Sequence, residues 1–86
     1  MVYEEIVDLL REQGKKAIGE HFLRCQFATA ESKIVCYIDI NTTDDELRRF
    51  FDMLSDMLPE TMKDLYRRYG ERGKVTSFEI KWVWVD

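Results

Sequence analysis

The side chains that most often carry chemistry are few in this chain: one histidine, His21, and two cysteines, Cys25 and Cys36. Nucleophilic catalysis needs a serine or cysteine held beside a base, and the pattern around His21 suggests no such pair. Two thiols and one histidine also leave a tetrahedral zinc site short of a ligand. We therefore expect His21 at the surface or at the rim of the core, and both cysteines as small apolar core residues. The protein is not predicted to be an enzyme.

Acidic residues form a second group, at Asp39 and in the run from Asp44 to Glu46. Their oxygens could bind a divalent cation. The spacing does not match a calcium-binding loop, however, and acids from Asp44 onward also suit the first turn of a helix. The segment 70–73 has two glycines but lacks the spacing and the following helix of a phosphate-binding loop. The sequence predicts neither a metal nor a cofactor.

Basic residues accumulate toward the end of the chain, although the formal net charge is −4. Residues 1–62 contain 7 Lys/Arg and 13 Asp/Glu, whereas residues 63–86 contain 6 and 4. A basic end of the molecule could contact phosphates, which makes nucleic-acid binding our second hypothesis. A solvated helix face with cations near its C-terminus remains the alternative. The candidate phosphate-contacting residues are Lys63, Arg67, Arg68, Arg72 and Lys74.

Hydrophobic periodicity predicts the elements that must position these side chains. Apolar residues recur every three or four positions in the helices and at alternate positions in the strands. Thr43 and Glu46 form a capping box at the start of a helix, and Pro59 either kinks that helix or ends it and begins another. The predicted elements are a helix over 2–13 that Gly14 ends, strands over 17–28 and 33–40, helices over 44–58 and 60–69, and a strand over 75–85.

The first two strands are predicted to form a hairpin. Apolar residues fall at odd positions in the first strand and at even positions in the second, so a shift of one residue would turn one set outward. A four-residue loop over 29–32 places Phe27 opposite Ile34 and Cys25 opposite Cys36. Loops of two or six residues satisfy the same rule.

The element order predicts a two-layer α+β sandwich, α-β-β-α-(α)-β, formed by a single domain over residues 1–86. The favoured sheet is antiparallel in strand order 2-1-3, with the helices on one face; order 1-2-3, with a parallel last pair, is the alternative. The helix-covered face is expected to include Trp82 and Trp84. Of residues 21–27, only the odd-numbered ones are expected on that face.

One layer of helices leaves the other face of the sheet open, and the final strand is apolar on both of its faces. We therefore expect a small non-enzymatic interaction or regulatory module, which forms a homodimer or binds another protein. No segment is apolar and long enough to cross a membrane, and two cysteines are too few for a disulfide scaffold, which favours the cytoplasm. The predicted interaction residues are Phe22, Arg24, Val35, Tyr37, Lys81, Val83 and Val85.

Overall fold

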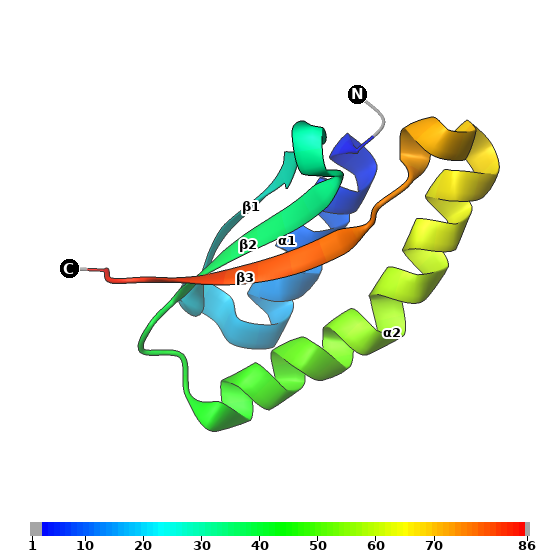
Figure 1. The fold of residues 1–86 in the computed structure, drawn as a ribbon. Helices are drawn as coiled ribbons and strands as arrows, with labels where there is room; N and C mark the ends of the chain where they lie inside the picture. Colours follow the sequence, from blue (N-terminus) through cyan, green and yellow to red (C-terminus); the bar gives the residue numbers. More distant parts are fainter. Residues whose placement is uncertain (1–2, 86) are drawn as a thin grey trace.

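The computed structural model describes residues 3–85 and has an α+β fold, with two long helices beside a three-stranded mixed sheet. Figure 1 shows α1 behind the sheet and α2 running along the side on which β3 lies. Within the described residues, no helix is long and apolar enough to span a membrane. The elements are α1 (Glu4–Ile18), β1 (Phe22–Ala28), β2 (Lys33–Asp39), α2 (Asp44–Tyr69) and β3 (Ser77–Val83), with short 3₁₀ turns η1 (Gly19–His21), η2 (Thr29–Glu31) and η3 (Gly70–Gly73).

The first helix is longer than the sequence predicted, because Gly14 does not end it. A Cβ atom added at Gly14 would lie 2.5 Å from Cδ2 of Phe22. Glycine at this position therefore allows the aromatic ring to pack directly against the helix backbone. The helix continues to Ile18 and ends at Gly19, whose φ of 58° is the left-handed conformation that favours glycine.

The second long helix begins as predicted. Thr43 Oγ1 accepts a hydrogen bond from the Glu46 N–H at 3.2 Å, and Glu46 Oε1 accepts one from the Thr43 N–H at 3.0 Å. This capping box satisfies backbone donors that the helix itself leaves unpaired. Pro59 lies inside one continuous helix, so the prediction of a second helix after it was wrong. Figure 1 shows α2 bending near its middle, as the other alternative anticipated.

The hairpin has the predicted four-residue connection and most of the predicted register. Phe27 lies opposite Ile34, and Cys25 lies opposite Cys36. The register shifts between Phe22 and Arg24, and this bulge places Phe22 opposite Ile38. The Phe22 side chain is consequently only 3% exposed and belongs to the core. Its predicted position on the open sheet face was wrong, because a bulge reverses the alternation of faces along a strand.

The strand order is β1-β2-β3, with β1 and β2 antiparallel and β2 and β3 parallel. The favoured order 2-1-3 was therefore wrong, and the alternative order is the one observed. The turn η1 is short, so α1 folds back onto β1 and occupies that part of the helical layer. Helix α2 packs beside α1, and the chain then returns next to β2. The crossover β2–α2–β3 gives the parallel pair.

The core lies between the two helices and the helix-facing side of the sheet. Its residues come from every long element except β3 and are largely apolar, as the amphipathic patterns predicted. The most deeply buried large side chains are Ile6, Leu10, Ile34, Ile38, Phe50 and Leu65. The corresponding side chains of β3, Phe78 and Ile80, are only partly buried. Burial thus decreases across the sheet from β2 to β3.

Candidate functional site

The sheet face away from the helices carries a set of polar contacts. The Arg24 guanidinium lies 4.3 Å from the centroid of the Tyr37 ring, and Gln26 Nε2 donates a hydrogen bond to Tyr37 Oη at 3.0 Å. Lys33 Nζ donates to Glu79 Oε1 at 2.8 Å. This ion pair is the main reason why the pKa of the Glu79 carboxyl is lowered. These contacts tie all three strands together on this face.

Val35 lies in the middle of this polar face and is only 3% exposed. Its neighbours in the register are Gln26 on β1 and Glu79 on β3, which have long side chains that can cover it. Of the predicted interaction residues, Phe22 and Val35 are thus buried, and Tyr37 is partly buried and hydrogen-bonded. The centre of this face is closed by the protein's own side chains.

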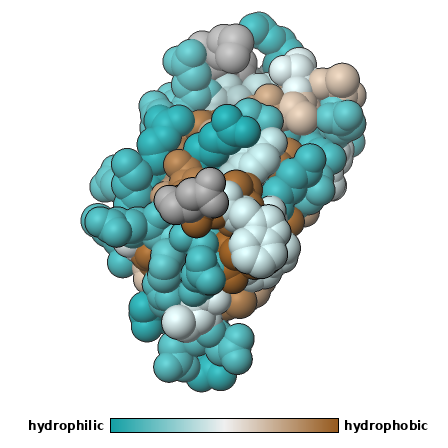
Figure 2. All heavy atoms as spheres, turned by 90° about the vertical axis from the view of Figure 1, so that its left-hand side faces the viewer, coloured by the Kyte–Doolittle hydropathy of each residue, from teal (hydrophilic) through white to brown (hydrophobic). Residues whose placement is uncertain are grey.

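Exposed apolar side chains lie instead on the last strand and just beyond its end. Trp82 is 48% exposed, Trp84 80% and Val85 46%, so the prediction that both tryptophans are covered by helices was wrong. Lys81 is exposed and Val83 is partly buried. Viewed from the end at which β3 finishes, the surface is largely hydrophilic, and hydrophobic side chains show through in its central part (Figure 2).

The free edge of β3 adds a second feature to this side of the molecule. β3 is the last strand of the sheet, so one row of its backbone N–H and C=O groups has no strand partner in residues 3–85. Its seven residues pair with β2 without a register shift. A regular, unbulged edge is the type to which a further strand can add.

Helix α2 presents different side chains to α1 and to β3. Arg49 Nε donates to the Ala17 carbonyl at 3.2 Å, and Arg68 pairs with Glu5, so this face of α2 lies against α1. A second face carries an apolar stripe beside β3, in which Phe51 and Tyr66 are 48% and 50% exposed. The stripe consists of Phe51, Leu58, Met62 and Tyr66.

Two hollows lie beside this stripe, one between α2 and β3 and the other between α2 and the connection that leads into β3. The first, here called the apolar pocket, has a volume of about 340 Å³ and combines residues of α2 with one residue of β3. Its lining is almost entirely hydrophobic, and it contains both the bend-associated proline and a partly buried phenylalanine of β3. The apolar pocket is lined by Phe51, Leu54, Ser55, Leu58, Pro59 and Phe78.

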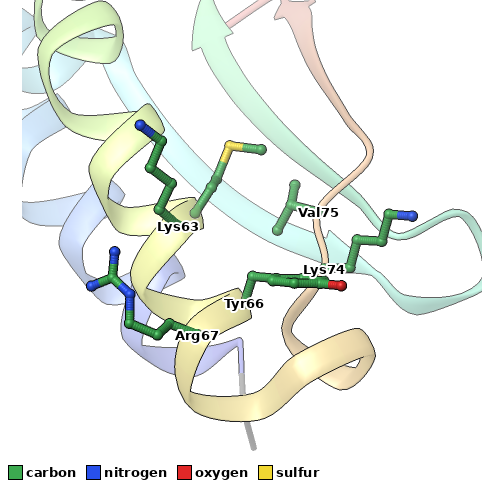
Figure 3. A pocket seen from close by; sticks show the side chains of 6 residues that line it. Lys63, Tyr66, Arg67, Lys74 and Val75 are labelled. Carbon is green, nitrogen blue, oxygen red and sulfur yellow. The ribbon is translucent and has the colours of Figure 1, made fainter.

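The second hollow, here called the basic pocket, is larger, at about 640 Å³. Figure 3 shows Lys63 and Arg67 on α2 at one side, Lys74 on the connection to β3 at the other, and Tyr66 and Val75 between them. Met62 completes the lining. An apolar floor under cationic side chains suits a group that is aromatic or apolar and carries or neighbours negative charge.

The turn η3 holds the two sides of the basic pocket together. A Cβ atom added at Gly73 would lie 2.4 Å from the Leu65 carbonyl oxygen, so only glycine lets the chain approach α2 this closely. Tyr3 Oη donates to the Lys74 carbonyl at 3.2 Å and fixes the connection from the side of α1. The backbone around Lys74 is therefore held in place by both helices.

The five basic residues proposed from the sequence do not form one patch. Lys63, Arg67 and Lys74 line the basic pocket, and the first two have no ion pair or hydrogen bond within residues 3–85. Arg68 turns to the opposite side, where it pairs with Glu5 and, at 2.8 Å, with Asp64. The Glu5 hydrogen bond raises the pKa of Arg68. Arg72 is exposed in η3 and does not line the pocket.

The two thiols lie opposite each other on β1 and β2, and both are free and buried. Cys25 Sγ donates to the Val7 carbonyl at 3.5 Å, which places it directly under α1. The hydrogen bond between the two thiols, together with burial, raises the pKa of the Cys36 thiol. A buried, protonated thiol is a poor nucleophile, so the geometry favours a packing role for Cys36.

His21 joins the end of α1 to the start of α2. Its Nδ1 lies 2.8 Å and 3.0 Å from the two carboxylate oxygens of Glu46. The Thr43 backbone hydrogen bond, followed by the contact with His21, lowers the pKa of Glu46. Asp39 Oδ1 accepts from the Asn41 N–H at 2.9 Å, which shapes the turn before α2. Among residues 3–85, no group of three or more histidine, cysteine or acidic residues could hold a metal ion.

Comparison with other proteins adds no family to this description. No protein-family model matches the chain, and no curated protein or solved structure matches it significantly.

Sequence reasoning missed the role of α2 in the exposed site. Phe51, Met62 and Tyr66 recur at helical spacing, a pattern that predicts an apolar helix face turned toward the core, and Trp82 and Trp84 were expected on the helix-covered face. One signal pointed to this region, because the run Trp82–Val85 is apolar on both faces of a strand. Both predicted strand orders already placed this strand at a sheet edge, but the run could not reveal that it pairs with β2, beside an incompletely covered helix.

Proposed function

We propose that this protein is a non-enzymatic protein-interaction module that binds an extended segment of a partner along the free edge of β3. The observation that carries the proposal is the coincidence of a regular unpaired strand edge with a row of exposed apolar side chains beside it. Backbone hydrogen bonds to β3 would supply affinity, and alternate side chains of the added strand would enter the apolar and basic pockets.

The exposed area is of the kind that soluble proteins usually cover. Single exposed hydrophobic residues are common, but Trp82 lies on β3 next to the apolar stripe of α2, and Trp84 follows just after the strand ends. Tryptophan is also enriched among residues that dominate binding energy at protein interfaces. These features support an interface that includes the C-terminal strand. The same features favour an interface at the sheet edge instead of the sheet face, where Arg24 and Tyr37 contact each other.

The residues with potential chemistry support a non-enzymatic role. His21 is engaged by Glu46, which also caps α2; Cys25 contacts α1, and both cysteines are buried in the core. Each of these side chains has a structural contact that explains its position. None of them lines the apolar pocket or the basic pocket.

Selection from a displayed random-peptide library would test strand addition without assuming a partner. Enriched peptides should alternate apolar and polar residues, and in NMR titrations they should shift the amides of β3 and the side chains of the two pockets. The charge reversal Arg24→Glu on the sheet face is the matched control and should leave peptide affinity unchanged. Peptides that shift the Arg24 and Tyr37 face instead, or a library without enrichment, would contradict the proposal.

A second candidate function, nucleic-acid binding, is favoured by the basic pocket alone. Lys63, Arg67 and Lys74 surround Tyr66, and cations beside an exposed aromatic ring can bind phosphate and a stacked base. Titration with single- and double-stranded oligonucleotides at low and moderate salt tests this alternative. Affinity should fall with rising salt and should be lost in the double variant Lys63→Glu/Arg67→Glu.

The matched control for that experiment reverses two cations far from the pocket. Lys16 and Arg48 are exposed, and within residues 3–85 they pair with near neighbours on their own helices, Glu12 at 3.6 Å and Asp45 at 3.7 Å. The variant Lys16→Glu/Arg48→Glu has the same net charge as the pocket variant. Equal loss of affinity in both variants would indicate nonspecific charge attraction and would remove the basic pocket as a nucleic-acid site.

A further inference from the structure

We infer that the segment which binds the β3 edge is β3 of a second copy of this chain, antiparallel and related by a two-fold axis beside Ile80. This inference rests on the proposed strand addition and names its partner. It follows from three properties of the strand itself: the symmetry that a shared edge requires, the order of charges on one face, and the position of the tryptophans on the other.

Symmetry limits the possible registers. A two-fold axis perpendicular to the sheet brings two copies of the same edge together as antiparallel strands and keeps both helical layers on one side. Directly opposite residues must then point to the same face. Phe78, Ile80 and Trp82 face the helices, whereas Glu79 and Lys81 face away from them. The axis must therefore pass beside a residue and not between two neighbouring residues.

The charges on the outer face select one residue for the axis. With the axis at Ile80, Glu79 of each copy lies opposite Lys81 of the other, which forms two cross-strand ion pairs. An axis at Glu79 would place the two glutamates opposite each other, and an axis at Lys81 would do the same with the lysines. Like charges directly opposite are unfavourable, so the neighbouring registers are disfavoured.

Glu79 can accept this additional partner without losing its present one. Its Oε1 is bonded to Lys33 at 2.8 Å, and a carboxylate has further acceptor positions on its two oxygens. Lys81 is exposed and contacts no acidic oxygen within 4.0 Å in residues 3–85. The second copy thus supplies a partner for a lysine that has no ion pair within residues 3–85.

The tryptophans on the helix-facing side meet the two pockets in the same register. Trp82 of one copy lies opposite Phe78 of the other, which lines the apolar pocket. Continued alternation past the end of β3 places Trp84 opposite Thr76, next to Val75 of the basic pocket. There its indole would lie among Lys63, Arg67 and Lys74, which are suited to contact an aromatic face. This single arrangement thus covers both exposed tryptophans and fills both pockets, and the two-fold axis repeats these contacts in the second copy.

Charge reversal in the full chain tests both the partner and the register. By sedimentation equilibrium, the unmodified chain should have the mass of two chains at high concentration. Glu79→Lys and Lys81→Glu should each weaken self-association by about tenfold or more, because each places like charges opposite one another twice. The double variant Glu79→Lys/Lys81→Glu should restore part of it, since the cross-strand ion pairs are re-formed with exchanged signs, whereas the ion pair between position 79 and Lys33 stays lost.

Mixing the two single variants gives the sharpest result. One has two positive residues and the other two negative residues on the outer face of β3, so a mixture should form a heterodimer in native mass spectrometry. Trp84→Ser should weaken the dimer while the circular dichroism and unfolding of the monomer stay unchanged, because Trp84 is 80% exposed. The matched control Arg24→Glu should leave the dimer mass unchanged.

The outcomes separate this inference from the proposed function. A chain that stays monomeric at all concentrations but still binds selected peptides at β3 overturns the second copy as partner and retains strand addition. A dimer whose mass is insensitive to both charge reversals overturns the register. If hydrogen exchange also leaves the β3 amides of that dimer unprotected, then the dimer uses another surface and strand addition fails as well.

Discussion

The two edge strands of this sheet, β1 and β3, differ in their regularity and in how far the rest of the protein covers them. At the β1 margin, here called the closed side, a bulge interrupts the strand edge, and α1 covers the strand so that Phe22 and Cys25 are buried. At the β3 margin, here called the open side, the strand is regular, and Phe51, Tyr66 and Trp82 are about half exposed. Bulges and close cover are common ways to protect an edge from pairing with another chain. The contrast makes the edge of β3, rather than that of β1, the one suited to the proposed strand addition.

Helix α2 contributes side chains to both sides, so the contrast can be tested with two neighbouring residues of this helix. Phe50 is fully buried, and its ring centroid lies 6.0 Å from that of Phe22, whereas Phe51 lines the apolar pocket. Phe50→Ala should lower the free energy of unfolding by about 3–5 kcal/mol, since it leaves a cavity in the core. Phe51→Ala should cost less than about 1 kcal/mol in the monomer. Urea unfolding at low protein concentration measures both, and equal losses would contradict the distinction.

A smaller loss of stability is expected for a substitution at Gly14, where the closed side is packed most tightly. Gly14→Ala adds a methyl group at 2.5 Å from the Phe22 ring, and overpacking of this kind costs about 1–3 kcal/mol. That cost should exceed the gain of about 1 kcal/mol which alanine normally brings to a helix. Lys15→Ala, at an exposed neighbouring position, is the control. Thermal unfolding should show a lower melting temperature only for Gly14→Ala, and an increase would show that the ring can move away.

The start of α2 connects the two sides. Its capping box should contribute less to the free energy of unfolding than the packing at Gly14 does. Thr43→Ala removes the hydrogen bond to the Glu46 N–H and should cost about 1 kcal/mol. Thr29→Ala, at an exposed threonine of the hairpin, should change the stability by no more than about 0.5 kcal/mol. The two variants compared by urea unfolding isolate the cap, and matching stabilities would show that Glu46 and His21 hold this joint without it.

The smallest expected effect is a pH dependence at the same joint. Hydrogen bonds from Thr43 and the contact with His21 lower the pKa of Glu46 below its ordinary value of 4.5. Its contribution is therefore complete above pH 4.5 and is lost as the pH falls through the lowered pKa. Glu46→Gln should flatten this acid limb in unfolding measurements made across acid pH, with Glu20→Gln as the exposed control. An unchanged acid limb would assign the dependence to other carboxylates.

Local interactions explain which parts of the fold could be predicted from the sequence. The capping box, the four-residue hairpin loop and the pairing of Cys25 with Cys36 depend on residues close together in the chain. The α+β class follows from the periods of the apolar residues. The burial of Phe22 could not be predicted, because it depends on a bulge and on space over Gly14, a residue from another element.

The candidate site was predicted only in part, for a related reason. The apolar C-terminal strand indicated an exposed surface, and the basic residues near the end of α2 indicated a charged region. The sequence could not show that Lys63, Arg67 and Lys74 share a pocket while Arg68 turns toward Glu5. That division depends on which face of α2 lies against α1, and several arrangements of two helices satisfy the same amphipathic pattern.

The sequence by itself determined the elements with local causes: an amphipathic helix capped by Thr43 and Glu46, a hairpin in fixed register, and a final strand rich in apolar residues. Only the tertiary structure decided where that final strand lies. Either edge of the hairpin could accept it in the same direction, and the local sequence of β3 is compatible with both. The position of α1 over β1 and of α2 beside it leaves the edge of β2 for β3. This placement exposes Trp82 and the stripe of α2, and thereby creates the open side.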